Sequence, residues 1–305
     1  MKNLFLVHLL FSTFFLSAQN KRDLIIKDSI LSTLNSNKTL QKSDYVRVKK
    51  IIISLDESYG YETELHKRLL DFSVFFDDLL FFKSELTLLI NKYGFNVAYL
   101  TGEENYYNLI FNGDLKVWFK KMYIENHSIW LENNFEKQVD FRKLNEIRIK
   151  DQLINTFASK LFFSKIMDSV QKKLIQSELN TFNFNNIGDL YGICKKYDKY
   201  PTDKSFSVIQ NNFGSTLVHN FQQQENIEKT WMLLFPFIKK AYLNYEIDNV
   251  VFKNYDFYLY TNFGFQDFNS YNISQIPEEF KKNNIEIPLR NKELFEKIKK
   301  EFNWQ

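Results

Sequence analysis

FGSTLVHNFQQQENIEKTWMLLFPFIKKAY, residues 213–242, is the stretch that decides the fold. From Ile227 onward its apolar residues recur every three or four positions, and charged residues fall mostly between them. The apolar positions are Ile227, Trp231, Leu234, Phe235, Ile238, Ala241 and Tyr242. A period of this kind places the apolar residues on one stripe of a helix. The stretch therefore predicts an amphipathic helix packed on a core.

Similar helical periods recur along the chain and predict a mainly α-helical protein. They indicate helices at residues 21–40, 45–55, 62–91, 115–135, 141–179 (one helix or two in tandem) and 186–197, with a break at Asn183. Residues 95–100 and 205–210 are short and strand-like, and residues 249–261 fit either a strand or a helix. We expect Pro236 to kink or split the helix that contains it, because proline removes one backbone hydrogen bond.

The four prolines of the chain all follow residue 200, so its character changes along its length. Residues 19–140 predict a helical, bundle-like N-terminal region with few helix breakers. Residues 141–305 predict a C-terminal helical module in which a few short strands can occur. We therefore expect two regions with a boundary near residue 140.

The first residues have the pattern of an export signal. Lys2 supplies a positive charge, residues 4–16 are mostly apolar, and the small residues Ser17 and Ala18 precede Gln19. The apolar run rises only about 20 Å as a helix, whereas the hydrocarbon core of a bilayer is about 30 Å thick. The sequence predicts a signal peptide at residues 1–18, cleavage after Ala18, and an exported, periplasmic or secreted protein without a stable membrane span after cleavage.

Charge and cysteine content exclude several classes of function. The chain has 305 residues, with 40 basic against 37 acidic side chains and a net charge of +3, which gives no electrostatic basis for binding nucleic acid. Its single cysteine, Cys194, excludes an internal disulfide and predicts a buried thiol. Glu62 and His66 are four residues apart but make an incomplete metal site, so we expect them at the surface. Neither a metal site nor a cofactor is predicted.

His219 is the strongest candidate for a chemically active side chain. It is followed by several amides, and a histidine can act as a general base near neutral pH. The candidate carboxylates that could orient its ring are Asp151, Asp256 and Asp267. The chain has no Gly-x-Ser-x-Gly turn, phosphate loop or His-Glu-x-x-His motif. A buried His219 with a purely structural hydrogen bond is the alternative.

From about Ile147 onward the order of several short motifs resembles an uncharacterised family of exported Bacteroidota proteins, described only as a domain of unknown function. The matching pieces are Lys150-Asp151-Gln152, Asn183, Tyr200-Pro201-Thr202, His219 with its amides, Pro236, Tyr258-Leu259-Tyr260, Gly264, Gln266 and Ile287-Pro288. Gln152, Gln223 and Gln266 are the candidate ligand-binding residues.

The chain departs from that family's pattern at polar positions. Asn155 stands where an arginine is expected, Thr261-Asn262 where an Asp-Arg pair is expected, and Asp198-Lys199 where a glycine precedes Tyr200. Losing two arginines would remove the bidentate anion contacts that guanidinium groups make. The resemblance thus implies a scaffold that is kept and an anion-binding capacity that is lost.

Two functional hypotheses follow. The first is an exported helical protein that binds a partner or ligand in the periplasm without catalysis, and the sequence identifies no particular partner. The alternative is a periplasmic hydrolase-like enzyme that uses His219 as general base.

Overall fold

The computed structural model describes residues 19–35, 40–162, 167–207, 213–282 and 285–304. The predicted signal peptide, residues 1–18, lies outside the described residues. Helices dominate these ranges, which contain no strand and only an isolated parallel bridge between Gln266 and Leu289. The prediction of a mainly α-helical fold is confirmed. In the same ranges, no helix is both long enough and apolar enough to span a bilayer.

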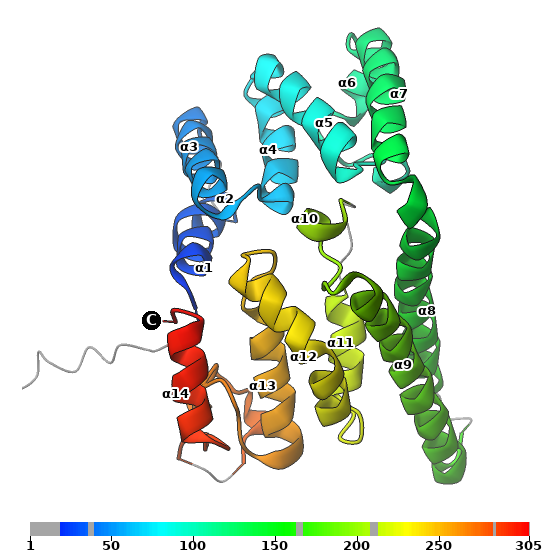
Figure 1. The fold of residues 1–305 in the computed structure, drawn as a ribbon, viewed down its shortest axis with the longest axis vertical. Coiled ribbons are helices and arrows are strands. Elements are labelled where there is room, and N and C mark those ends of the chain that lie inside the picture. Colours follow the sequence, from blue (N-terminus) through cyan, green and yellow to red (C-terminus); the bar gives the residue numbers. More distant parts are fainter. Residues whose placement is uncertain (1–18, 36–39, 163–166, 208–212, 283–284, 305) are drawn as a thin grey trace, which may run out of the picture.

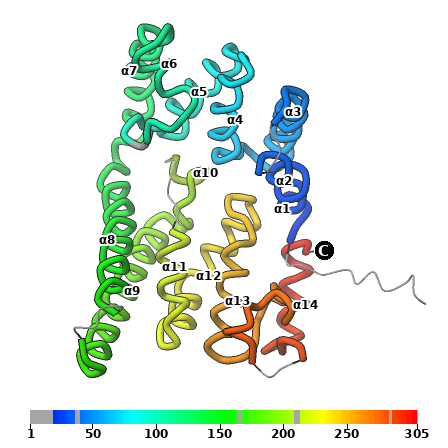
Figure 2. Tube along the Cα trace, turned by 180° about the vertical axis from the view of Figure 1, so that it is seen from behind, coloured from blue at the N-terminus to red at the C-terminus, as the bar shows by residue number. Residues whose placement is uncertain are grey.

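The helices form two tiers, one above the other in Figure 1. The N-terminal tier contains α3 (Lys42–Tyr59), α4 (Thr63–Phe75), α5 (Leu79–Tyr93), α6 (Tyr107–Phe111) and α7 (Lys116–Asn133). The C-terminal tier contains α9 (Ser169–Tyr197), α11 (Gly214–Phe221), α12 (Ile227–Leu243), α13 (Val250–Phe263) and α14 (Lys292–Glu301). Figure 2 shows the same two tiers from behind.

The remaining elements connect the tiers. The long helix α8 (Gln138–Phe162) runs down one side, and the short helix α10 (Asp203–Phe206) lies between the tiers (Figure 1). On the other side lies a continuous helical segment made of α1 (Lys21–Ile25), the π-helix η1 (Ile26–Leu31) and α2 (Ser32–Leu34). Single 3-10 turns are η2 (Val97–Tyr99), η3 (Phe135–Lys137), η4 (Ile273–Gln275) and η5 (Glu278–Phe280).

The amphipathic helix predicted from residues 213–242 is α12, and its apolar stripe lies in the core of the C-terminal tier. Ile227, Leu234 and Ile238 have no exposed surface. The indole of Trp231 stacks on the ring of Tyr255 with centroids 4.0 Å apart. This core extends from Leu144 in α8 to Trp304, whereas the N-terminal tier has separate clusters of its own. The boundary predicted near residue 140 falls at the start of α8 and stays a prediction.

The local predictions have different outcomes. Pro236, which was expected to kink or split its helix, lies at an exposed position inside the continuous helix α12. Residues 249–261, which fit either a strand or a helix, belong to the helix α13, with Asn249 as its N-cap residue. The strand expected at residues 95–100 is replaced by η2, and of residues 205–210 the described part begins in α10.

Asn183 does not break a helix either. It lies inside α9, fully buried, where its amide exchanges hydrogen bonds with the amide of Asn155 in α8. An asparagine in a helix interior is tolerated when its side chain finds such a partner instead of competing for the local backbone. Residues 141–179 lie in two successive helices, α8 and α9, which is one of the two predicted arrangements.

Candidate functional site

The structure brings together two of the candidate catalytic residues, His219 in α11 and Asp151 in α8. The Nδ1 atom of His219 lies 3.0 Å from Oδ2 and 3.1 Å from Oδ1 of Asp151. The Asp151 side chain is completely buried, whereas the His219 side chain is 21% exposed. The pair thus lies at the protein surface, with the carboxylate buried between the helices and the imidazole partly exposed to solvent.

This geometry determines the roles of the ring nitrogens. With Nδ1 facing both carboxylate oxygens, Nδ1 carries the hydrogen and donates it, so in the neutral ring Nε2 is the acceptor. Within the described ranges, no side chain is hydrogen-bonded to Nε2. A buried carboxylate that orients an imidazole in this way leaves Nε2 able to take a proton or to accept a hydrogen bond.

Amides surround the Asp151 carboxylate from the same helix. Gln152 Nε2 donates to Asp151 Oδ2 at 3.0 Å, although most of Gln152 faces solvent. Asn155, one turn later, donates to the Asp151 carbonyl at 2.8 Å and to Asn183 Oδ1 at 3.0 Å. Asn155 therefore lies directly beside the carboxylate and places a neutral amide there.

A further set of amides joins α9 to α11 and to the turn that follows α11. Asn220 donates to the carbonyl of Asn183 at 3.0 Å, and Asn226 donates to the carbonyl of Asn180 at 3.0 Å. Gln176 donates to the candidate ligand-binding residue Gln223 at 3.1 Å. Hydrogen-bonded in this way, these buried or half-buried groups avoid the cost of an unpaired polar atom.

The described residues do not pair His219 with a nucleophilic side chain. In the described part of the chain, no serine, threonine or cysteine side chain is hydrogen-bonded to the His219 ring. The one cysteine, Cys194, is buried as predicted, and burial raises the pKa of its thiol to about 12. Among the described residues, no group of three or more histidine, cysteine or acidic side chains is arranged so that it could hold a metal ion. The site can accept a hydrogen bond or activate a water, and its described residues include no nucleophile that is hydrogen-bonded to the imidazole.

The other two candidate carboxylates have different partners. Asp267 pairs with Arg290, whose Nε donates to Asp267 Oδ1 at 2.8 Å. Asp256 is fully buried in α13 and accepts the backbone N–H groups of residues 267, 268 and 270 at 2.8 to 3.1 Å. Burial raises the pKa of the Asp256 carboxyl to about 7, even though these backbone donors favour its charged form. Asp256 fixes a loop, and Asp267 belongs to a surface ion pair.

Gln266, a candidate ligand-binding residue, is 1% exposed, and its groups are used within the chain. Its backbone N–H donates to the carbonyl of Pro288 at 2.9 Å, and its side-chain amide donates to the carbonyl of Tyr271 at 3.0 Å. Gln266 therefore holds the segment before α14 against the end of α13.

The structure corrects the expectation that Glu62 and His66 lie at the surface. They are 6% and 2% exposed. His66 lies between two carboxylates, with Nε2 2.7 Å from Asp56 Oδ2 and Nδ1 2.9 Å from Glu85 Oε1. The helical period of α4 places His66 on its inner face, and Glu62 is buried at the N-cap position just before the helix, which charge alone did not suggest.

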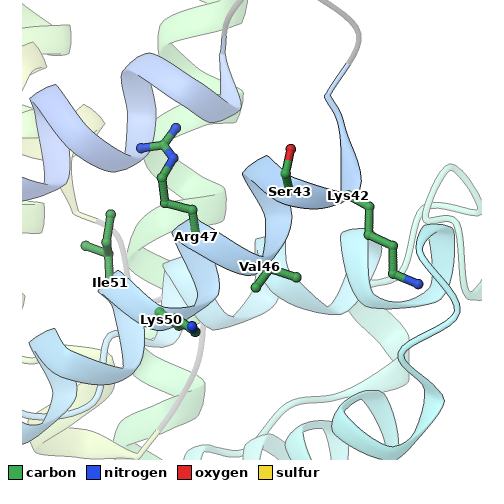
Figure 3. A pocket seen from close by; sticks show the side chains of 6 residues that line it. All are labelled: Lys42, Ser43, Val46, Arg47, Lys50 and Ile51. Atoms are coloured by element: carbon green, nitrogen blue, oxygen red, sulfur yellow. The ribbon is translucent and has the colours of Figure 1, made fainter.

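A separate cavity of about 630 Å³ lies on α3, far along the chain from His219. Figure 3 shows its lining residues, which are Lys42, Ser43, Val46, Arg47, Lys50 and Ile51. All six residues belong to α3, so the cavity is an open depression on the surface of this helix, with basic residues at its edge. It shares no residue with the His219 site.

Residue type alone identifies His219 and Asp151 in the sequence. It does not identify Gln176, Asn180 and Asn226, because the only signal for them in the sequence is how often amide residues occur. Comparison with known proteins adds no assignment: no family model, curated protein or solved structure matches the chain.

Proposed function

We propose that this chain is an exported, non-enzymatic binding protein whose ligand contacts the surface of α8, α9 and α11 around His219. The supporting observation is the Asp151–His219 pair. The buried carboxylate of Asp151 orients the partly exposed imidazole of His219, and no described side chain is hydrogen-bonded to its Nε2 atom. Nε2 is thus a hydrogen-bond acceptor that is held in one orientation and is partly exposed, and a ligand that donates a hydrogen bond requires such a group.

The surrounding groups define the kind of ligand. Gln152 is exposed, and Asn155 and Gln223 are half-buried, so the groups near His219 are mainly neutral amides. Amides offer both donors and acceptors, whereas anions are bound by arginine and lysine. We infer a neutral ligand rich in hydroxyl or amide groups, in keeping with Asn155 at the position where the resembled family has an arginine.

A hydrolase that uses His219 as general base is the second candidate. It is favoured by the same hydrogen bond, because a carboxylate at Nδ1 is the usual orienting group for a histidine base. The substrate would have to be attacked by water, since no described hydroxyl or thiol is hydrogen-bonded to the ring. Hydrolysis would convert substrate to product and binding alone would not, so an activity assay distinguishes the two functions.

The test uses residues 19–305 as wild type, His219→Ala and His127→Ala, the last a partly buried histidine of α7 that serves as control. Thermal melts are recorded with a panel of oligosaccharides, peptides and small neutral metabolites. A ligand at 100 times its dissociation constant stabilises the protein by about 2.7 kcal/mol. We expect a shift in wild type and His127→Ala that is absent in His219→Ala.

The same three proteins are incubated with chromogenic esters, peptides and glycosides. Turnover that disappears only in His219→Ala would replace the binding proposal by the hydrolase. No shift and no turnover, with His219→Ala merely less stable, would show that the histidine is structural and would reject both functions.

A further inference from the structure

Helix α8 has a second apolar face, which is exposed to solvent. Ile149, Leu153 and Phe157 are 53%, 66% and 59% exposed, although each side chain is large and apolar. They follow one another at intervals of four residues and therefore form a continuous line on the helix surface, the α8 stripe. Both ribbon views show α8 along one edge of the molecule (Figures 1 and 2).

The α8 stripe is distinct from the His219 site. Successive residues of an α-helix are about 100° apart around its axis, so Leu153 points about 200° away from Asp151. Asp151 and Leu144 lie on the side of α8 opposite Leu153, and both are fully buried. A partner on the stripe would therefore lie on the other side of α8 from the Asp151–His219 pair.

Opposite charges stand at the two ends of the α8 stripe. Glu146 lies three residues before it and Lys160 three residues after it, so both continue its line. The Glu146 side chain is 43% exposed, and Lys160 is exposed as well. Glu146 contacts Arg142 at 3.1 Å and Lys150 at 3.8 Å within the same helix. Such exposed pairs are weak and leave the carboxylate available to a cation of another molecule.

These five positions are symmetric about Leu153. Ile149 and Phe157 lie four residues on either side of it, and Glu146 and Lys160 lie seven residues on either side. If two α8 helices pack antiparallel with Leu153 at a two-fold axis, each Ile149 faces a Phe157 and each Glu146 faces a Lys160 of the other copy. If they pack parallel, each charge faces its own equivalent and repels it.

We propose that two copies of this chain associate through the α8 stripe, with the helices antiparallel and Leu153 at the two-fold axis. The pairing removes the apolar side chains of both copies from water and joins each Glu146 to a Lys160 of the other copy. One pair of helices buries less than the roughly 1,600 Å² of a standard interface, so we expect the dimer at micromolar rather than nanomolar concentrations. The inference does not depend on the ligand proposed at His219.

Sedimentation equilibrium of the full chain over a series of concentrations measures the association. Wild type should pass from monomer to dimer, and Leu153→Glu should require concentrations at least about tenfold higher, because the dimer would bury its charge. Ile124→Glu replaces a comparably exposed apolar residue of α7 and should dimerise like wild type. A monomeric wild type, a dimer that survives Leu153→Glu, or an equal loss in both variants would overturn the proposal.

Exchanging the charges tests the antiparallel arrangement. Glu146→Lys and Lys160→Glu should each self-associate about tenfold more weakly than wild type, because like charges then face each other in both contacts. An equimolar mixture of the two variants should recover the affinity of wild type, since every contact again joins a lysine to a glutamate. A mixture that associates no more tightly than the separate variants would contradict this arrangement.

Cysteine cross-linking locates the two-fold axis. The native Cys194 is buried, so an introduced exposed thiol is the one that reacts. Under mild oxidation Leu153→Cys should form a disulfide-linked dimer, whereas Ile149→Cys should not, because its two copies would lie about 12 Å apart along the helices. Ile149→Cys mixed with Phe157→Cys should cross-link. Equal cross-linking of all three single variants with themselves would indicate a parallel pair and overturn the proposed dimer.

Discussion

At the scale of single residues, His66 is the side chain whose surroundings most change its chemistry. Burial alone would lower the pKa of His66, but hydrogen bonds and charge from Asp56 and Glu85 outweigh it and raise the pKa to about 9. The ring also stacks on Tyr61, whose hydroxyl donates to Glu85 and whose own pKa is raised by burial. The folded protein therefore binds the His66 proton more tightly than the unfolded chain does.

This predicts a pH dependence of stability. The contribution of His66 is fully present below 6.5, the ordinary pKa of histidine, and is lost as pH rises through about 9. In urea titrations between these values, one proton accounts for a slope of at most about 1.4 kcal/mol per pH unit in the free energy of unfolding. His66→Gln should lose this slope, whereas Lys67→Gln, its neighbour in α4, should keep it. Equal slopes in wild type and His66→Gln would contradict the assignment.

The candidate site shows what residue types can and cannot predict. His219 and Asp151 stand out because a histidine and a carboxylate make a chemically capable pair, and this choice was available from the sequence. Their meeting was not, because 68 positions separate them and only the packing of α8 against α11 brings them together. The amides Asn155 and Asn183 carry no such signal, since asparagine is common throughout this chain.

At the scale of elements, Gly94 decides how α5 meets its neighbours. It ends α5 in the left-handed conformation, with φ of +68°. A Cβ there would lie 2.6 Å from the Trp130 indole and 2.7 Å from the Ser207 carbonyl oxygen. These two groups are hydrogen-bonded to each other at 2.7 Å, which joins α7 to the end of α10. A side chain at position 94 would disrupt this junction.

Gly94→Ala should therefore lower the free energy of unfolding by about 2–4 kcal/mol, combining the left-handed backbone cost with overpacking. Gly264→Ala is the matched control, because Gly264 ends α13 in the same conformation and its Cβ would meet only the Lys282 side chain at 3.4 Å. That control should cost about 1 kcal/mol. Chemical denaturation measures both, and equal losses would show that the close approach at Gly94 carries no energy.

Helices were predictable wherever a single apolar stripe faces the core, as in α12. The failures occur where aromatic and β-branched residues are dense, because these residue types also favour strands. In α13 the buried residues Phe252, Tyr255, Asp256, Leu259 and Tyr260 follow the helical period, but one of them is a carboxylate and several partly buried aromatics lie between them. The buried acid and the aromatic residues on several faces of α13 obscure the helical period of apolar residues in the sequence.

At the scale of the whole molecule, an ion cluster ties the beginning of the chain to both tiers. The guanidinium of Arg22 before the π-helix contacts Glu62, the residue that precedes α4, with donor–acceptor distances of 2.6 and 2.7 Å. Lys204 in α10 donates to the same carboxylate at 3.0 Å and to the carbonyl of Tyr245 at 2.7 Å. Burial lowers the pKa of Lys204, and the charge of Glu62 opposes that shift. These partners lie 40 and 142 positions from Glu62, so no local pattern could have predicted them.

Glu62→Gln tests whether this cluster holds the tiers together. The glutamine keeps the shape of the side chain but removes the counter-charge that the buried Arg22 and the half-buried Lys204 share, and breaking a buried pair from one side costs about 3–5 kcal/mol. Glu57→Gln, an exposed carboxylate on α3, is the control and should change stability by less than about 0.5 kcal/mol. Because Glu62 joins α1, α4 and α10, hydrogen exchange in Glu62→Gln should accelerate in all three helices and not in α13. Acceleration confined to α4, with a loss no larger than that of Glu57→Gln, would mean that apolar packing alone positions the tiers.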